Sequence, residues 1–178
     1  MKSVQFEGVV FTAKPLFDHD RLVEIFSPTL GKVKVLAKSA QKKSLQFGGR
    51  LEPGAHIALT CTQGRSFLYL SDATPKSLFT AIRADFNKIS LMGYFFDIIR
   101  KATVFDQHNE DLFALLIRTL AALNTERELD HIKAAFHGEF LWIEGLLETP
   151  ERWVSDHDFK RAFEGYTGQP LRLPMVLK

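Results

Sequence analysis

The sequence predicts an α+β protein, in which a five-stranded β-barrel is followed by an α-helical bundle. Two observations lead to this fold class. Up to about residue 72, short runs rich in β-branched and aromatic residues are separated by turn residues at regular intervals. From about residue 76, apolar residues recur instead with the spacing of a helix. We therefore expect a barrel domain over residues 1–75 and a helical domain over residues 76–178.

Five short segments carry the strand pattern. The expected strands cover residues 4–12, 21–26, 32–38, 57–62 and 67–70. A turn at Gln63 and Gly64 would join the last two strands into a hairpin. Five strands of this length match the OB-fold, so we expect an OB-like barrel. Cys61 is the only cysteine and is expected to be buried on the fourth strand, which excludes an internal disulfide and a cysteine-rich zinc site.

Three apolar stripes at i, i+3, i+4 and i+7 spacing predict three longer helices. The stripes are Met92, Phe95, Phe96 and Ile99; Leu112, Leu115, Leu116, Thr119, Leu120 and Leu123; and Leu129, Ile132, Phe136, Phe140, Ile143 and Leu147. Capping boxes are predicted at Thr125 with Glu128, before the third helix, and at Ser155 with Asp158, before a short fourth helix. The glycines expected to end the fourth helix are Gly165 and Gly168.

Positive charge is concentrated in the first part of the chain. Residues 1–80 contain 11 Lys and Arg against 6 Asp and Glu, whereas residues 81–178 contain 12 against 15. No acidic residue occurs between Glu24 and Glu52. On the strand expected there, Lys32, Lys34 and Lys38 share one face because side chains alternate, and the opposite face holds the apolar residues Val33, Val35 and Ala37.

A row of ammonium groups on one strand face is typical of a surface that binds nucleic-acid phosphates. The predicted DNA-binding residues are Lys14, Arg21, Lys32, Lys34, Lys38, Lys42, Lys43, Arg50 and Arg65. Reversing the charge of Lys42 and Lys43 is expected to abolish DNA binding without unfolding the protein. Phe47 could stack on a base, although packing is its more common role, and packing is also expected for Phe67 and Tyr69. The alternative reading is that the lysines only protect a strand edge from aggregation.

Residues with catalytic potential form no recognisable site in the sequence. The six histidines are scattered, and the Asp-His-Asp triplets at residues 18–20 and 156–158 are typical of a turn and a helix start. No phosphate-binding glycine loop and no nucleophile elbow occur. We therefore expect no catalytic residue, no metal site and no cofactor. No signal peptide and no apolar run of membrane-spanning length are visible, so a soluble intracellular protein is expected.

Several stretches, in a consistent order, resemble the RecO family of bacterial recombination mediators. Residues 8–15 and 20–28 are similar to the family's first two strands, and Gly48-Gly49-Arg50-Leu51-Glu52-Pro53 is the most specific match. Residues 30–32 and 37–40 are similar to its next strand and basic loop. Residues 82–86 and 93–95 resemble its first long helix, and residues 159–163 and 168–172 resemble its closing helix and tail. The four-cysteine zinc module of many members is missing between Leu147 and Ser155, so the chain resembles a short form.

The resemblance implies a set of functions and partners. Proteins of this family bind single- and double-stranded DNA in the bacterial cytoplasm, at the nucleoid, and anneal complementary strands without catalysis. They associate with RecR, contact the C-terminal tail of single-stranded DNA-binding protein and help load RecA in gap repair and homologous recombination. The candidates for binding that tail are Arg118, Arg127 and Lys133.

Two other functions fit the same residues. A generic OB-fold protein that binds single-stranded nucleic acid, including RNA, would share the lysine row without needing the helices. A protein-interaction scaffold would use the helices alone. The salt dependence of binding distinguishes nucleic-acid binding from the scaffold function. Binding through about five phosphates weakens steeply as the salt concentration rises, whereas binding through an apolar contact does not.

Overall fold

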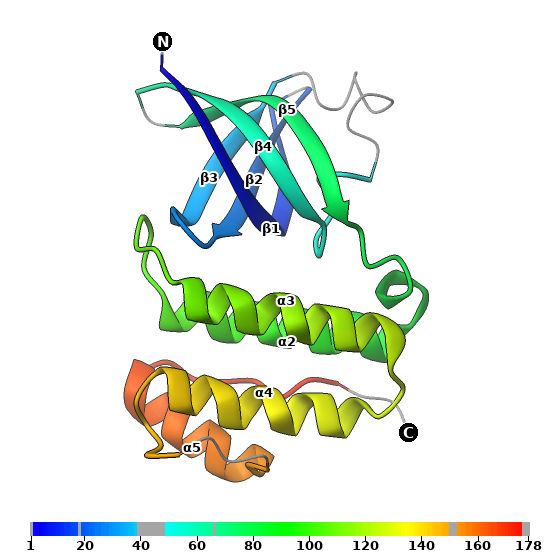
Figure 1. Ribbon diagram of the computed structural model, residues 1–178, viewed down its shortest axis with the longest axis vertical. Helices are drawn as coiled ribbons and strands as arrows, with labels where there is room; N and C mark the ends of the chain where they lie inside the picture. Colours follow the sequence, from blue (N-terminus) through cyan, green and yellow to red (C-terminus); the bar gives the residue numbers. More distant parts are fainter. Residues whose placement is uncertain (1, 18, 39–48, 66, 150–152, 176–178) are drawn as a thin grey trace. The chain divides into compact units, whose positions relative to one another are not determined.

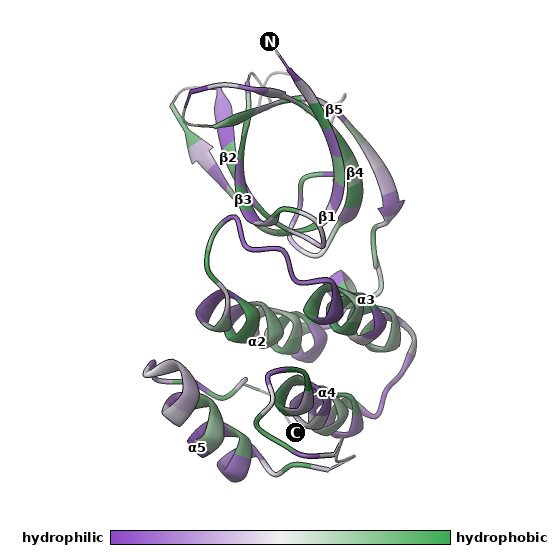
Figure 2. Cartoon of the chain, turned by 60° about the vertical axis from the view of Figure 1, so that its left-hand side comes forward, coloured by the Kyte–Doolittle hydropathy of each residue, from purple (hydrophilic) through white to green (hydrophobic). Residues whose placement is uncertain are grey.

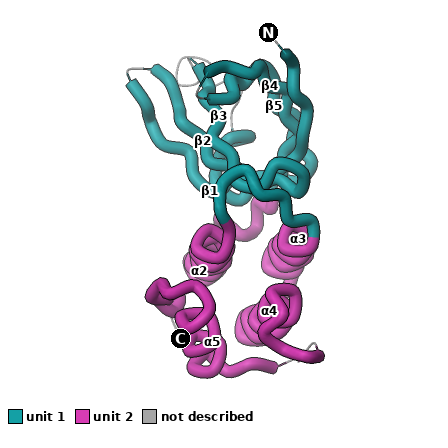
Figure 3. The backbone as a smooth tube through the Cα atoms, turned by 90° about the vertical axis from the view of Figure 1, so that its left-hand side faces the viewer, with its two compact units in different colours: residues 1–78, 104–110 teal, residues 79–103, 111–178 magenta. Residues whose placement is uncertain are grey.

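The computed structural model describes residues 2–17, 19–38, 49–65, 67–149 and 153–175. The chain divides into two compact units, residues 1–78 with 104–110 and residues 79–103 with 111–178. Figure 3 draws residues 104–110 in the colour of the first unit. That segment lies in the part of the sequence that was predicted to form the helical domain. Because it belongs to the first unit, no single boundary in the sequence separates the two units.

The first unit is a closed five-stranded barrel (Figure 1). Its strands are β1 (Ser3–Leu16), β2 (Asp20–Ser27), β3 (Gly31–Ala37), β4 (His56–Gln63) and β5 (Leu68–Ser77). They follow one another around the barrel in the order β1-β2-β3-β5-β4, and the β3–β5 pair is the parallel one. The predicted fold class and the predicted hairpin of the last two strands are confirmed. Most strands extend beyond the predicted bounds, and β5 by the most.

The barrel interior is filled by side chains that alternate with outward-facing ones. Val33, Val35 and Ala37 of β3 are buried in this core, as the alternation predicts. Cys61 is fully buried on β4, also as predicted, and burial raises the pKa of its thiol to about 12. Such a thiol remains protonated at neutral pH and serves as a small apolar side chain.

The core side of β5 differs from the prediction. Leu68 and Leu70 pack against the barrel core. Tyr69 therefore points outward, because neighbouring side chains on a strand take opposite faces. Phe67 and Tyr69 remain partly exposed. Their predicted role in the core is wrong because the two leucines occupy those positions.

The second unit contains the helices. They are the 3₁₀ helix η1 (Ile82–Ala84) and the α-helices α2 (Phe86–Ala102), α3 (Glu110–Thr125), α4 (Leu129–Ile143) and α5 (Asp156–Thr167). The three predicted apolar stripes lie on α2, α3 and α4. In Figure 2 apolar and polar residues fall on different faces of these helices. The fully buried rings of this core are Phe95, Phe136, Phe140, Phe159 and Phe163.

The third stripe was extended too far. α4 ends at Ile143, because Gly145 adopts a left-handed conformation with φ of 71°. Leu147, which the pattern included, lies beyond the helix and is only partly buried. Among the described residues, none of the helices is both long and apolar enough to cross a membrane.

The two predicted capping boxes have opposite outcomes. Thr125 is the last residue of α3 and its hydroxyl donates to the Ala121 carbonyl at 3.1 Å, while Glu128 makes no side-chain cap. The first box is therefore wrong, because Thr125 belongs to the preceding helix. Ser155 accepts a hydrogen bond from the Asp158 amide at 3.1 Å, so the N-cap of the second box is confirmed at Ser155.

The C-terminal end of α5 agrees with one of its two predicted glycines. Gly168 caps the helix with φ of 67°. Gly165 lies inside the helix instead. The C-cap of α5 has a left-handed conformation. Gly168 fits this position because a residue without Cβ adopts that conformation at no steric cost.

Candidate nucleic-acid interface

Strand register places three of the predicted lysines on the outside of the barrel. Lys14 lies opposite Leu22, and Leu22 lies opposite Leu36. Side chains directly opposite each other share a face, so Lys14 faces the same side as Leu36 and, by alternation, as Lys34 and Lys38. All three lysines are exposed.

Lys32 also belongs to this face, but it is not an exposed member of a row. Only 6% of its surface is accessible, because residues 105 and 106 lie along β3 at this point. Its Nζ lies 5.0 Å from the centroid of the Phe105 ring. The predicted row of three equivalent ammonium groups is therefore corrected to two exposed ones, on Lys34 and Lys38.

Two of the predicted arginines are engaged within the barrel. Arg21 lies opposite Ala37, a core residue, so its side chain starts on the inward side of β2. Its guanidinium pairs with Glu52 at 3.2 Å. Arg50 donates to the Ala73 carbonyl of β5 at 3.0 Å. Both arginines connect the segment at residues 50–52 to the strands, which is a structural role the sequence did not reveal.

The basic loop contributed most to the sequence prediction. Lys42, Lys43 and Phe47 lie outside the described residues. Their assignment to DNA binding stays a prediction.

Aromatic side chains accompany the exposed cations. The Lys38 Nζ lies 4.9 Å from the centroid of the Tyr69 ring, and the Lys34 Nζ lies 5.0 Å from that of Phe105. Arg65 is exposed at the turn between β4 and β5. We call the following set the basic–aromatic face: Lys34, Lys38, Arg65, Phe67, Tyr69 and Phe105. Cations beside aromatic rings provide partners for both phosphates and bases.

Phe105 is the residue of this face that sequence reasoning missed. It lies in the connection between α2 and α3, far along the chain from the strands. Its only signal in the sequence is an aromatic residue in a polar connection, Val104-Phe105-Asp106-Gln107, between two helices. It is 46% exposed.

The connection that carries Phe105 is fixed to the edge of β3. The Asp106 amide donates to the Lys32 carbonyl at 3.2 Å, which forms a parallel bridge between Lys32 and Phe105. The backbone of Gln107 passes so close to Gly31 that a Cβ at Gly31 would lie 2.0 Å from the Gln107 carbonyl oxygen. Gly31 also has φ of 65°, a conformation that favours glycine.

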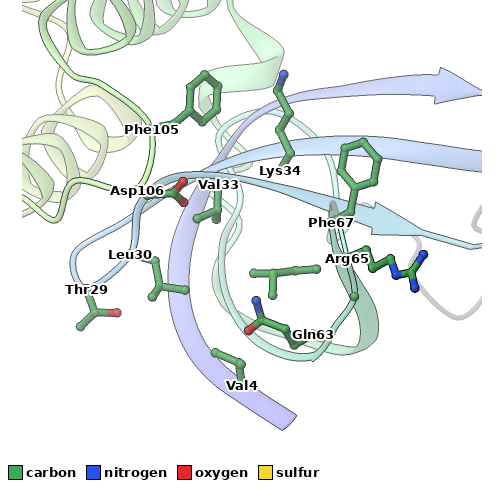
Figure 4. Close-up of a pocket in the computed structure, with 12 residues that line it drawn as sticks. Val4, Thr29, Leu30, Val33, Lys34, Gln63, Arg65, Phe67, Phe105 and Asp106 are labelled. Atoms are coloured by element: carbon green, nitrogen blue, oxygen red, sulfur yellow. The ribbon is translucent and has the colours of Figure 1, made fainter. Parts of the chain in front are cut away.

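A pocket of about 460 Å³ opens within the basic–aromatic face (Figure 4). The residues around it are Val4, Thr29, Leu30, Val33, Lys34, Gln63, Gly64, Arg65, Phe67, Leu68, Phe105 and Asp106. In Figure 4 the Lys34 side chain stands between the rings of Phe105 and Phe67, with Arg65 beside Phe67. The pocket thus combines an apolar lining, two cations and two rings.

The candidates for tail binding in the helical unit have different surroundings. Arg118 forms an ion pair with Glu139 and lines a cavity of about 420 Å³ together with the exposed Trp142. The Lys133 side chain is 13% exposed and pairs with Asp156 at 2.8 Å, which indicates a structural role.

The third candidate, Arg127, is exposed in the connection between α3 and α4. It does not line the cavity that Arg118 and Trp142 share. Of the three, Arg118 is therefore the one with an apolar surface beside it.

A buried polar pair lies inside the helical unit. The Tyr94 hydroxyl and His137 Nε2 are 2.9 Å apart, and the imidazole stacks on Phe159 with 3.9 Å between centroids. Burial lowers the pKa of His137 to about 4, although Asp156 acts in the opposite direction. Among the described residues, no group of three His, Cys, Asp or Glu side chains could hold a metal ion.

Comparison with known proteins gives one consistent result. Residues 1–79 match the family described as recombination protein O N terminal. The chain is 28% identical to a DNA repair protein RecO from Alkaliphilus metalliredigens, over 80% of this chain and 58% of the relative. It is 30% identical to the RecO of Geobacter metallireducens (82% and 59%) and 31% identical to that of Anaeromyxobacter dehalogenans (83% and 59%).

These alignments define how far the relationship extends. The first covers 144 residues and so continues past residue 79 into the helical unit. The chain spans a little under three fifths of the length of these relatives. Residues 1–79 thus match the RecO N-terminal domain family, and about four fifths of the chain is similar to proteins named DNA repair protein RecO.

Proposed function

We propose that this chain binds DNA through the basic–aromatic face and acts as a recombination mediator in DNA gap repair. The observation that carries the proposal is the gathering of Lys34, Lys38 and Arg65 with three rings on one side of the barrel. When exposed cations neutralise phosphates, counterions bound to the nucleic acid are released, and this release drives association with any nucleic acid. The names of the relatives direct the proposal to DNA repair.

The mechanism requires electrostatics and no chemical step. Two complementary strands repel each other through their phosphates, and lysines on the barrel lower this repulsion while the strands pair. Lys14 would extend the positive surface around Lys34 and Lys38, and Lys42 and Lys43 are proposed as further phosphate contacts from the sequence alone. Arg21 and Arg50, which are held by Glu52 and Ala73, would support the barrel rather than contact phosphates first.

The helical unit is the proposed site for protein partners. By analogy with the family, RecR, the tail of single-stranded DNA-binding protein and, indirectly, RecA are the candidates. For the tail, the cavity beside Arg118 and Trp142 supplies a cation and an exposed ring. Asp111 and Glu139 line the same cavity, so an acidic tail would have to displace Glu139 from Arg118.

Fluorescence anisotropy tests DNA binding directly. A labelled single-stranded oligonucleotide, its duplex and an RNA of the same sequence are titrated with the protein at low and moderate salt. About five phosphate contacts predict a slope of about −3.5 in log K against log salt for single strands. Absence of binding at low salt would refute the proposal, and a preference for RNA would favour the generic nucleic-acid-binding alternative.

A further inference from the structure

We infer that the pocket lined by Phe105 and Phe67 receives one unstacked base of single-stranded DNA, while Lys34 and Arg65 hold the adjoining phosphates. The inference rests on the proposed function and deepens it, because it gives this DNA-binding face a preference for single strands. It also assigns a role to Phe105, which lies outside the barrel strands in the sequence.

The size and the lining of the pocket suit a base. Its volume of about 460 Å³ falls in the range of sites for small organic ligands. Val4, Leu30 and Leu68 supply apolar surface, and the two rings supply faces on which a flat heterocycle can stack. A phosphate alone would gain little from the apolar part of this lining.

Charge determines which end of a nucleotide faces which side of the pocket. Lys34 and Arg65 stand near Phe67, and Figure 4 shows Asp106 displaced from them toward Thr29 and Leu30. A carboxylate repels phosphate, so the DNA backbone should follow the two cations and avoid Asp106. The Asp106 carboxylate and the Gln63 amide can accept hydrogen bonds from an amino group on a base edge.

Phe105 is held in place before any ligand arrives. The backbone bridge to Lys32 and the close passage of Gln107 past Gly31 fix its segment on β3. Lys32 and Lys34 each place an ammonium group 5.0 Å from its ring centroid. A ring that is already positioned loses little conformational freedom when a base stacks on it, which favours binding.

Such a pocket discriminates between forms of DNA. In a duplex the bases are stacked and paired, and only the phosphates reach the cations. In a single strand any base can turn out of the stack at small cost and enter. Removing the ring should therefore weaken single-strand binding and leave duplex binding intact, whereas removing a cation should weaken both.

The test compares Phe105→Ala with Phe17→Ala. Phe17 is an 81% exposed aromatic of the same barrel that does not line the pocket, so its variant is the matched control. Affinities are measured for a single strand containing the fluorescent base 2-aminopurine and for its duplex. We expect Phe105→Ala to lower single-strand affinity about tenfold, with loss of the change in 2-aminopurine fluorescence that binding to the wild type produces and no change for duplex. Phe17→Ala should match the wild type.

A second measurement uses the unaltered protein and so does not depend on folding of a variant. An oligonucleotide in which several nucleosides are replaced by abasic residues keeps its phosphates but offers no base there. We expect it to bind about tenfold more weakly than the intact strand. Equal affinity for the two strands, or equal losses for single strand and duplex in Phe105→Ala, would overturn the inference. The proposed function would survive both results, since neither of them removes DNA binding by the wild type, whose absence at low salt would refute it.

Discussion

The Lys34 ammonium nitrogen lies 5.0 Å from the centroid of the Phe105 ring. That contact connects β3 of the barrel to the segment that joins α2 and α3. Because cations and rings interact by electrostatic attraction, each residue helps to position the other. The same contact brings an aromatic ring to the lysines that were predicted to bind phosphates.

Reversing two charges on the basic–aromatic face tests the proposed interface. Lys34→Glu with Lys38→Glu should lower affinity for single strands and duplexes alike, by about a hundredfold at low salt, because two phosphate contacts become repulsive. Lys160→Glu with Arg172→Glu makes the same change in net charge on the helical unit. Anisotropy at several salt concentrations measures both variants. If the control loses as much affinity, net charge alone accounts for binding and the face has no special role.

Replacing Gly31 tests the anchoring of Phe105. The Cβ in Gly31→Ala would meet the Gln107 carbonyl at 2.0 Å, so the segment at residues 105–107 must move away from β3. We expect a loss of about 2–3 kcal/mol in the free energy of unfolding and faster hydrogen exchange at the Asp106 amide, which bonds Lys32.

Gly49→Ala provides the control for that substitution. Gly49 has φ of 69°, close to that of Gly31, but a Cβ there would meet nothing within 4 Å. Its variant should show only the cost of the left-handed conformation, about 1 kcal/mol, with unchanged exchange at Asp106. Similar losses in both variants would mean that the contact with Gln107 contributes nothing.

Buried His137 should make stability depend on pH. Its pKa is lowered from 6.5 to about 4 in the folded protein, so below pH 6.5 the unfolded chain binds a proton that the folded chain does not. Its contribution is therefore complete above pH 6.5 and is lost as the pH falls toward 4. Between pH 7 and pH 5 we expect the free energy of unfolding to fall by about 2 kcal/mol from this group.

Urea denaturation at the two pH values measures the effect, and His137→Phe should reduce it. That variant leaves the buried Tyr94 hydroxyl without its partner, so it should also be less stable at pH 7. The change with pH, rather than stability itself, is the diagnostic quantity. Replacement of the exposed His19 by Gln should preserve the full dependence, and an unaltered dependence in His137→Phe would contradict the assignment.

The cavity of the helical unit can be tested with a peptide that has acidic residues and an apolar C-terminus. Arg118→Glu should weaken its binding about tenfold, because one ion pair becomes a repulsion. Arg127→Glu, outside the cavity, should have little effect. Glu139→Gln should strengthen binding severalfold, since it removes the carboxylate that pairs with Arg118. Trp142 fluorescence reports occupancy, and equal losses at Arg118 and Arg127 would refute the choice of this cavity.

Local periodicity accounts for the parts of the fold that were predicted well. Strand alternation identified Val33, Val35 and Ala37 as core, and helical spacing identified the apolar faces of α2, α3 and α4. Both predictions use the side-chain periods of the strand and the helix. A stretch of about ten residues is long enough to show which of these two periods its apolar residues follow. The lengths of β5 and α4 were less predictable. Pairing with β4 extends β5, whereas the left-handed conformation of Gly145 ends α4.

The amino-acid sequence by itself determined the fold class, the division into a strand-rich and a helical part, and the strand face on which Lys34 and Lys38 lie. Tertiary structure alone decided that Lys32 is covered, that Arg21 turns to Glu52 and that Tyr69 points outward beside Lys38. It also brought Phe105 to β3 through a backbone bridge. The reason is physical: periodicity records how a segment faces its surroundings, whereas strand register and the approach of distant segments depend on packing across the whole unit.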